Sequence, residues 1–413
     1  MTDTPDQTLS PSDAQAFREK CRAFLEANVK NAGITRATSK QDRGAAVMAA
    51  TKVFQAKLAE AGLAGLTYPV EFGGRGLAKA YDRIWREEYS RFPDVTFELT
   101  ISHGMCLPMM NDFGTPEQKR QFLPDIIRAN TIWCQMFSEP GAGSDVASLQ
   151  TKAVLDGDEW ILNGQKVWTT LAHLSDYGLL VARTNPEAPK HAGISMFILD
   201  MKAPGVEIRP IHQIDGGRHF NEIFFTDVRV PKDRLLGELN NGWNQATAML
   251  MYERVAIGTG SSSGVSHPNA DRLIEDAKTL GNITSPAIRQ SLMKMYCEET
   301  TKSLVSLRTR AEMKAGRAPG PGGSLGKLHG AKIARMLRTL TSEVHGASIM
   351  AHEAGSKSEL LATGITGSFA SNIAGGTDEI QKNIIGDRVL GLPREPAVDK
   401  DVPFKDLKVG TLR

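Results

Sequence analysis

The chain has 413 residues, 41% of them hydrophobic and 23% charged, a composition typical of globular proteins with two or three domains. Forty-nine basic and forty-seven acidic side chains leave a net charge of +2, which does not indicate nucleic acid or an anionic membrane as a partner. The sequence lacks an apolar run of roughly eighteen residues, so we expect no membrane span. The polar, acidic start does not resemble a secretory leader. Four widely spaced cysteines exclude a disulfide scaffold and predict a cytoplasmic protein.

Helical periodicity marks the first part of the chain. It predicts helices over Ala14–Ala27 and Ala45–Ala61, with Asp13 as a cap for the first. Further along, Thr115 has the position of an N-cap, and Gln118 stands where a capping box places its glutamine. These signals predict an N-terminal helical domain.

The periodicity changes near Thr131, where short runs of β-forming residues alternate with turn residues. Asp156-Gly157-Asp158 and Asn163-Gly164 have the composition of tight hairpin turns. Several strands at this spacing predict a small barrel or sandwich. The predicted strands are Ile132–Phe137, Thr151–Val154, Glu159–Leu162, Gly178–Arg183, Ile194–Leu199, Val206–Ile211 and Glu222–Val230.

Helical periodicity returns near Trp243 and lasts to about Gly386, except in the Gly- and Pro-rich stretch Ala315–Gly326, which predicts a loop. The whole pattern predicts an α+β fold. Its three domains are an N-terminal helical domain (1–130), a middle small β-barrel or sandwich domain (131–242) and a C-terminal helical bundle (243–413).

The segment Ser138–Asp145 concentrates glycines beside hydroxyl and acidic side chains, directly after a predicted strand. Glycines let a backbone approach a ligand closely, and successive amides in such a loop form an anion-binding nest. From the residues alone, a plain polar turn is the reading that the physical argument favours, and the ligand-binding loop is the alternative.

Glu253 stands out because its neighbours on the same helical face, Met249, Leu250, Ala256 and Ile257, are all apolar. A carboxylate in such surroundings has a raised pKa, which suits a general base at neutral pH. A structural salt bridge is the alternative that the residues leave open.

Five motifs in order resemble the acyl-CoA dehydrogenase family over nearly the whole chain. They are Phe113-Gly-Thr-Pro-Glu-Gln-Lys119, Ser138-Glu-Pro-Gly-Ala-Gly-Ser-Asp145, Asn163-Gly-Gln-Lys-Val-Trp-Thr-Thr170, Phe220-Asn-Glu-Ile-Phe-Phe-Thr-Asp-Val-Arg-Val-Pro231 and the C-terminal pair Ala374-Gly-Gly-Thr-Asp-Glu-Ile-Gln381 and Arg388-Val-Leu-Gly-Leu-Pro-Arg394.

The resemblance implies FAD, held between the β-domain and the C-terminal bundle and completed by a neighbouring subunit. Ser138 would hydrogen-bond the isoalloxazine, Trp168 would cover it and Thr170 would donate toward N5, while Ser144 would also contact CoA. The residues expected to contact FAD are Gln135, Met136, Phe137, Ser138, Gly143, Ser144, Trp168, Thr169, Thr170, Gln290, Thr377 and Glu379.

The resemblance also implies removal of the α proton and the β hydride from an acyl-CoA thioester. In some branches of the family the base precedes the Gly-Thr of the C-terminal signature, but here that position is Gly375, which cannot act as a base. The long-chain and isovaleryl branches place it on the helix after the β-domain, beside an arginine, as Glu253-Arg254 is placed here. We therefore expect Glu253 as the base, Arg254 as a substrate contact, and the Gly375 amide as a donor to the thioester oxygen.

The expected activity is oxidation to the trans-2-enoyl-CoA in fatty acid β-oxidation, with an electron-transferring flavoprotein as acceptor and a homotetramer or dimer as assembly. An Arg-x-x-Phe-Gly flavin contact of the family is missing before Gln290. Gln135 and Ala374 replace bulkier aromatics of some relatives, which leaves branched, aromatic or polycyclic acyl groups open. The alternatives are a flavin oxidase or monooxygenase of the same fold, or a subunit that completes a partner's flavin site in a hetero-oligomer.

Overall fold

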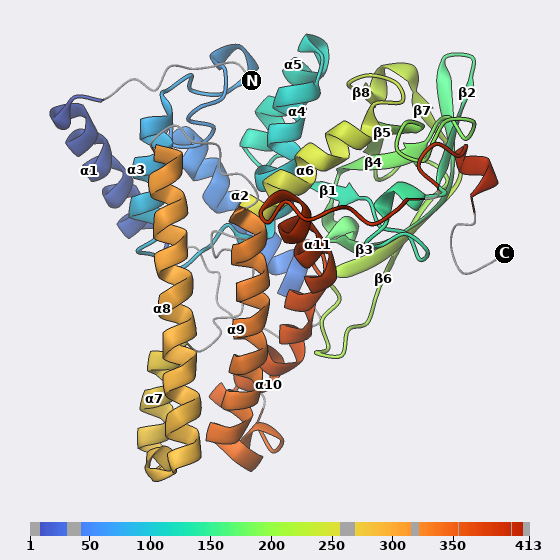
Figure 1. Ribbon diagram of the computed structural model, residues 1–413. Helices are drawn as coiled ribbons and strands as arrows, with labels where there is room; N and C mark the ends of the chain where they lie inside the picture. The colour runs from blue at the N-terminus through green and yellow to red at the C-terminus, as the bar shows by residue number, and fades with distance from the viewer. Residues whose placement is uncertain are drawn as a thin grey trace. The chain divides into compact units, whose positions relative to one another are not determined.

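The computed structural model describes residues 9–30, 43–256, 269–314, 322–353, 355–397 and 399–407 (Figure 1). The chain forms two compact units, one comprising Met1–Ala256 with Ala397–Arg413 and the other Ile257–Pro396. The predicted order of a helical, a β-rich and a second helical region is confirmed. Within the described residues, no helix is both long and apolar enough to cross a membrane.

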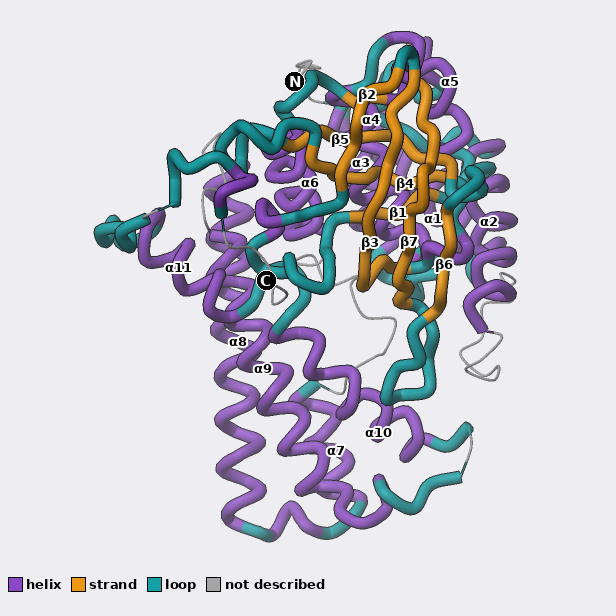
Figure 2. Tube along the Cα trace, turned by 90° about the vertical axis from the view of Figure 1, so that its right-hand side faces the viewer, coloured by secondary structure: helices purple, strands orange, loops and turns teal. Residues whose placement is uncertain are grey.

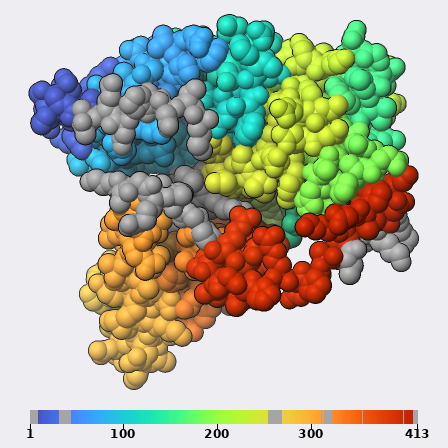
Figure 3. All heavy atoms as spheres, turned by 45° about the horizontal axis from the view of Figure 1, so that its top comes forward, coloured from blue at the N-terminus to red at the C-terminus, as the bar shows by residue number. Residues whose placement is uncertain are grey.

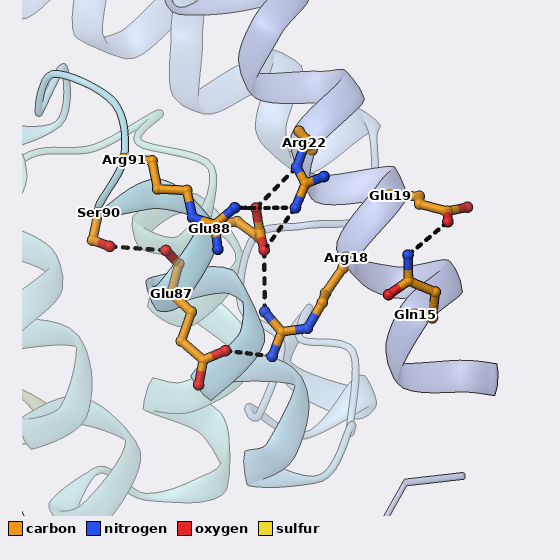
Figure 4. Close-up of polar contacts among 8 residues, drawn as sticks. All are labelled: Gln15, Arg18, Glu19, Arg22, Glu87, Glu88, Ser90 and Arg91. Carbon is orange, nitrogen blue, oxygen red and sulfur yellow. Dashed lines mark hydrogen bonds and ion pairs between the residues drawn. The ribbon is translucent and has the colours of Figure 1, made fainter. Parts of the chain in front are cut away.

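The first unit begins with helices that pack around a buried carboxylate. Glu88 is fully buried, and its oxygens lie 3.1, 3.2 and 3.3 Å from guanidinium nitrogens of Arg18, Arg22 and Arg91 (Figure 4). Because Arg18 and Arg22 belong to α1 and Glu88 to α3, this cluster fastens the two helices together. The helices of this region are α1 (Pro11–Asn28), α2 (Arg43–Glu60), α3 (Lys79–Tyr89), α4 (Leu107–Phe113) and α5 (Pro116–Ile127).

The caps of these helices correct one prediction and confirm another. Ser10, not Asp13, is the N-cap of α1, and its hydroxyl accepts a hydrogen bond from the Asp13 amide at 3.1 Å. Asp13 lies inside the first turn, where a carboxylate suits the helix dipole. At α5 the capping box is confirmed, because the Gln118 amide donates to Thr115 Oγ1 and the Thr115 amide donates to Gln118 Oε1.

Eight strands form one sheet in the order β6-β7-β3-β2-β4-β5-β8, with β1 paired to β4 in parallel (Figure 2). The longest pairing is antiparallel, between β3 and β7. The strands are β1 (Trp133–Met136), β2 (Lys152–Asp156), β3 (Glu159–Thr170), β4 (Tyr177–Arg183), β5 (Ile194–Asp200), β6 (Val206–Pro210), β7 (Phe220–Pro231) and β8 (Leu235–Leu236).

The sheet curls so that β3 and β7 pack across β4 and β5, as a small barrel or sandwich requires. Trp160 of β3 and Phe197 of β5 meet edge to face at 5.3 Å inside the core formed by these strands. On β4, Leu180 points into this core while Val181 packs against the N-terminal helices. The apolar side chains of β4 do not alternate with polar ones, because this strand is buried on both faces.

One of the two predicted hairpin turns is correct. Gly157 and Asp158 connect β2 to β3, with Asp156 paired to Glu159. The predicted turn at Asn163-Gly164 is wrong, because both residues lie inside β3 at a shift of register against β7. Gly164 has φ +149°, so the glycine here serves an irregular strand and not a reversal of the chain.

The remaining helices divide between the units. Helix α6 (Gly242–Ala256) packs into the core of the first unit through Ala246 and Met249. The second unit contains α7 (Ala270–Thr279), α8 (Pro286–Lys314), α9 (Gly322–His345), α10 (Lys357–Gly367) and α11 (Asp378–Arg388). The loop predicted over Ala315–Gly326 is wrong from Gly322 onward, where α9 begins despite its glycines because its buried face packs against α7 and α8; residues 315–321 lie outside the described part.

Candidate active site

The loop Ser138–Asp145 follows β1 directly and lies beside β3. The Val167 amide donates to the Ser138 carbonyl at 2.9 Å, which brings the two predicted flavin segments together. Gly143 and Ser144 are exposed at the far end of the loop. The loop therefore presents its glycine-rich part to solvent while its first residues are tied to the sheet.

A buried ion pair anchors this loop. Lys166 Nζ on β3 lies 2.8 Å from Glu139 Oε1, and the Gln150 and Thr151 amides donate to the same carboxylate. Lys166 also donates to the Phe137 carbonyl at 2.9 Å. Burial alone would raise the pKa of Glu139, but Lys166 and the two amides hold it below its usual value. Glu139 is therefore a structural carboxylate and not a proton acceptor for a substrate.

Trp168 stands out from the end of β3 because of a β-bulge. Lys166 pairs with Ile223 and Thr169 with Asn221, so β3 has one residue more than β7 between these pairs. Trp168 has φ +61° and is 58% exposed, with its ring edge to face with Phe220 at 5.9 Å. A large aromatic side chain in this strained and exposed position offers a flat apolar surface to a ligand.

The residues after Trp168 are held from the neighbouring strand. Asn221, fully buried on β7, donates through Nδ2 to the Thr169 carbonyl at 2.9 Å. Its Oδ1 lies 2.9 Å from His173 Nδ1, and burial lowers the pKa of that imidazole. Thr169 itself is 2% exposed, and its hydroxyl has no hydrogen-bond partner among the described residues. This buried and unsatisfied hydroxyl is a position where a bound ligand could supply the missing partner.

The other predicted cofactor residues of the first unit differ in how far their side chains are buried. Gln135 and Ser138 are partly buried, as is Thr170. The side chains of Met136 and Phe137 are buried in the two cores on either side of the sheet. Any contact of these two residues with a ligand would therefore use the backbone.

Glu253 lies in the last turns of α6. Met249, one turn earlier, is fully buried, and Glu253 is itself partly buried. The adjacent Tyr252 donates a hydrogen bond to the Asp112 carboxylate of α4, which fixes this part of the helix. Glu253 is thus neither fully exposed nor fully buried, and its role as the base stays a prediction. The Arg254 side chain lies outside the described part of the chain.

The C-terminal signature forms the N-terminus of α11 in the second unit. Gly375 and Gly376 have φ +67° and +86°, and Thr377 caps the helix by accepting from the Ile380 amide. Gln381, fully buried, donates to the Gly375 carbonyl at 2.8 Å. This hydrogen bond fixes the orientation of the peptide group between Gly375 and Gly376.

Sequence reasoning missed the residues that support both motifs. Lys166 holds the Ser138–Asp145 loop through Glu139, and Gln381 holds the Gly375 carbonyl. Asp378 accepts hydrogen bonds from Arg335 at 2.5 Å and from Asn372 at 2.9 Å. Of these, Lys166 had a sequence signal, because strand alternation places this charged side chain on an inward face. Glu379 and Gln290, predicted as FAD contacts, are exposed.

The residues of the first unit fit the isoalloxazine of FAD. An exposed indole, a buried hydroxyl without a partner and a glycine-rich loop lie on adjoining segments, which suits a flat aromatic group rich in hydrogen-bonding atoms. Ser138, Trp168, Thr169 and Thr170 are the residues that would hold it.

Three family models match the chain in succession. The N-terminal domain of acyl-CoA dehydrogenase matches residues 11–130, the middle domain residues 134–228 and the C-terminal domain residues 240–390.

The chain is also similar to individual proteins over most of its length. It is 38% identical to acyl-CoA dehydrogenase IpdE1 of Mycobacterium tuberculosis (strain ATCC 25618 / H37Rv), over 93% of this chain and 99% of that protein. Its fold resembles the Tcur3481-Tcur3483 steroid ACAD, with a TM-score of 0.76 and 26% identity over 94% of this chain and 99% of that one. It also resembles the ChsE4-ChsE5 complex from Mycobacterium tuberculosis, with a TM-score of 0.71 and 28% identity over 94% of this chain and 99% of that one.

Proposed function

Because the chain belongs to the acyl-CoA dehydrogenase family of oxidoreductases, we propose that it uses FAD to convert an acyl-CoA thioester to the trans-2-enoyl-CoA. The observation that carries this proposal is the junction of the Ser138–Asp145 loop with the exposed Trp168 and the unsatisfied Thr169 hydroxyl. We further propose an electron-transferring flavoprotein as the acceptor.

In this proposal Glu253 removes the proton from the carbon α to the thioester. Glu253 is partly buried one turn from the buried Met249, and this step needs a general base at such a position. As the proton leaves, negative charge develops on the thioester oxygen, and the backbone amide of Gly375 would stabilise it. When bound, FAD supplies the acceptor for the hydride from the β carbon. Arg254 and Ser144 would contact the CoA ester.

We propose that the acyl group is polycyclic or branched and not a simple straight chain. Gln135 and Ala374 stand where some relatives have bulkier aromatics, and these residues would permit a wider acyl pocket. A structural neighbour with 26% identity is named a steroid ACAD, which supports a fused-ring acyl group.

The names of two structural neighbours support a second candidate, in which this chain acts as one subunit of a mixed dehydrogenase. Tcur3481-Tcur3483 and ChsE4-ChsE5 are both named as pairs. The missing Arg-x-x-Phe-Gly segment before Gln290 agrees with a flavin contact that another chain supplies. The chain produced alone would then retain clearly less than one FAD per subunit, whereas a homotetramer or homodimer retains one.

The test of the substrate class is anaerobic bleaching of the bound flavin by a panel of straight-chain, branched and fused-ring acyl-CoA thioesters. We expect bleaching by the fused-ring thioesters.

The test of the base is the variant Glu253→Gln, which should keep FAD but lose turnover about a hundredfold or more. Glu343→Gln, an exposed carboxylate on α9, is the control and should keep full activity. Full activity of Glu253→Gln would reject the base assignment. Oxygen consumption without any response to CoA thioesters would favour an oxidase of the same fold.

A further inference from the structure

The C-terminal segment Asp399–Leu407 is docked on the first unit. The Phe404 amide donates to the Ala188 carbonyl at 2.9 Å, and the Lys405 amide donates to the Pro186 carbonyl at 3.0 Å. Phe404 and Leu407 are each 8% exposed. Figure 3 shows the end of the described chain, in red, against the green surface of the β-rich part. The segment therefore runs along the loop between β4 and β5 and not freely in solvent.

Phe404 covers an arginine that holds the end of the Ser138–Asp145 loop. The guanidinium carbon of Arg183 lies 3.6 Å from the centre of the Phe404 ring, and Arg183 is 4% exposed. Arg183 donates to the carbonyls of Ala147 and Lys190, each at 2.6 Å. A desolvated cation under an aromatic face is a favourable contact, so the ring stabilises the arginine in this position. Arg183 holds the carbonyl of Ala147, two residues after the loop, and is itself covered by Phe404. The C-terminal segment is therefore connected to the end of the loop through this arginine.

A second contact joins the same three parts of the chain. Lys190 Nζ lies 3.1 Å from Asp145 Oδ2, at the end of the loop, and 3.4 Å from Asp399 Oδ2, at the start of the C-terminal segment. Burial would lower the pKa of Lys190, but the two carboxylates raise it above its ordinary value, so this lysine stays charged. One ammonium group thus links the loop to the C-terminal segment.

We propose that the segment Asp399–Leu407 positions the Ser138–Asp145 loop for binding of the CoA thioester, acting through Arg183 and Lys190. The inference rests on the proposed function, since the loop carries Ser144, the expected CoA contact. Because the proposed base is on α6 and not on this loop, loosening the segment should weaken substrate binding more than it slows the chemical step.

The experiment uses two variants of the full FAD-loaded chain, Phe404→Ala and Asp399→Asn. We expect KM for the acyl-CoA to rise about five- to tenfold while kcat stays within about twofold. Hydrogen exchange of the backbone amides from Gly141 to Ser148 should also become faster. Phe404→Tyr and Asp399→Glu keep the aromatic face and the charge and should restore both measurements.

The controls are Asp401→Asn, an exposed aspartate in the same segment, and Lys190→Met combined with Asp399→Asn. Asp401→Asn should leave KM and exchange unchanged. The double variant should resemble Lys190→Met alone, because Lys190→Met already removes the ion pair that Asp399→Asn would break. Unchanged KM and exchange in Phe404→Ala and Asp399→Asn would overturn the proposal, even if the melting temperature falls. If no acyl-CoA bleaches the wild-type flavin, the proposed function fails, and the exchange measurement still decides whether the segment orders the loop.

Discussion

The Lys166 ammonium and the Glu139 carboxylate lie 2.8 Å apart in the interior, where Lys166 is fully buried and Glu139 is 7% exposed. The pair joins the middle of β3 to the first turn of the Ser138–Asp145 loop. The carboxylate also accepts from two backbone amides, so both of its oxygens have a hydrogen-bond donor within the protein. The loop is therefore held by charge at its beginning and by Arg183 and Lys190 at its end.

Lys166→Met should lower the free energy of unfolding by about 3–5 kcal/mol, because it leaves Glu139 buried without its counter-ion. Denaturant unfolding with and without FAD measures the change. Lys202→Met is the matched control: it removes an exposed ion pair with Asp176 and should cost less than about 1 kcal/mol. Equal losses in both variants would show that the buried pair contributes no more than a surface pair.

Trp168→Ala should weaken FAD binding about tenfold or more while leaving the unfolding of the apoprotein nearly unchanged, since the exposed indole contributes little to the core. The FAD dissociation constant and apoprotein unfolding check the two parts. Trp160→Phe offers the opposite control. It alters a side chain that is 5% exposed in the core between the strands, and should reduce stability without changing the FAD affinity. FAD affinity unchanged in Trp168→Ala would remove the indole from the proposed flavin site.

The stability of the first unit should fall in acid because of Glu88. Burial by itself would raise the pKa of this carboxyl, but Arg18, Arg22 and Arg91 lower it below its ordinary value. A lowered pKa in the folded state stabilises the fold above the unfolded pKa of about 4.3, and this stabilisation is lost as the pH falls through the folded value. Unfolding measured from pH 7 to pH 3 should show this loss in the wild type. Glu88→Gln should be less stable at pH 7 and less sensitive to acid, whereas Glu343→Gln should follow the wild-type curve.

Gly164→Ala should destabilise the protein by about 1–3 kcal/mol. The backbone there has φ +149°, and an added Cβ would lie 2.6 Å from Thr151 Oγ1. Gly157→Asn is the control, because Gly157 has φ +62° in an open turn and asparagine tolerates that conformation. A Gly164→Ala variant as stable as the wild type would mean that Thr151 can move away from the added Cβ.

The helical and β-rich regions follow from local patterns, which is why the sequence predicts them. The Thr115–Gln118 capping box depends only on residues three positions apart, and the structure confirms it. The error at Asn163-Gly164 has a different origin. Whether that pair forms a turn or continues a strand is decided by pairing with β7, more than fifty residues later, and no local pattern contains that information.

In the candidate site, too, the sequence predicts the residues of local motifs but not the contacts between distant segments. Motifs identify Ser138, Trp168 and Thr170, but spacing along the chain does not reveal that the Val167 amide bonds to Ser138. The docking of Phe404 on Arg183 is likewise a contact between distant segments. Gln381 belongs to a recognised motif, yet its support of the Gly375 carbonyl depends on the left-handed glycines before it.

Strand β4 contributes side chains to both cores of the first unit, Leu179 and Val181 to one and Leu180 and Ala182 to the other. Neither core can lose this strand and keep its packing. Local melting of the curled half of the sheet would thus also expose the apolar surface under α4 and α6. We therefore expect helix α6, which carries the proposed base, and strand β3, which carries Trp168, to unfold in one cooperative transition.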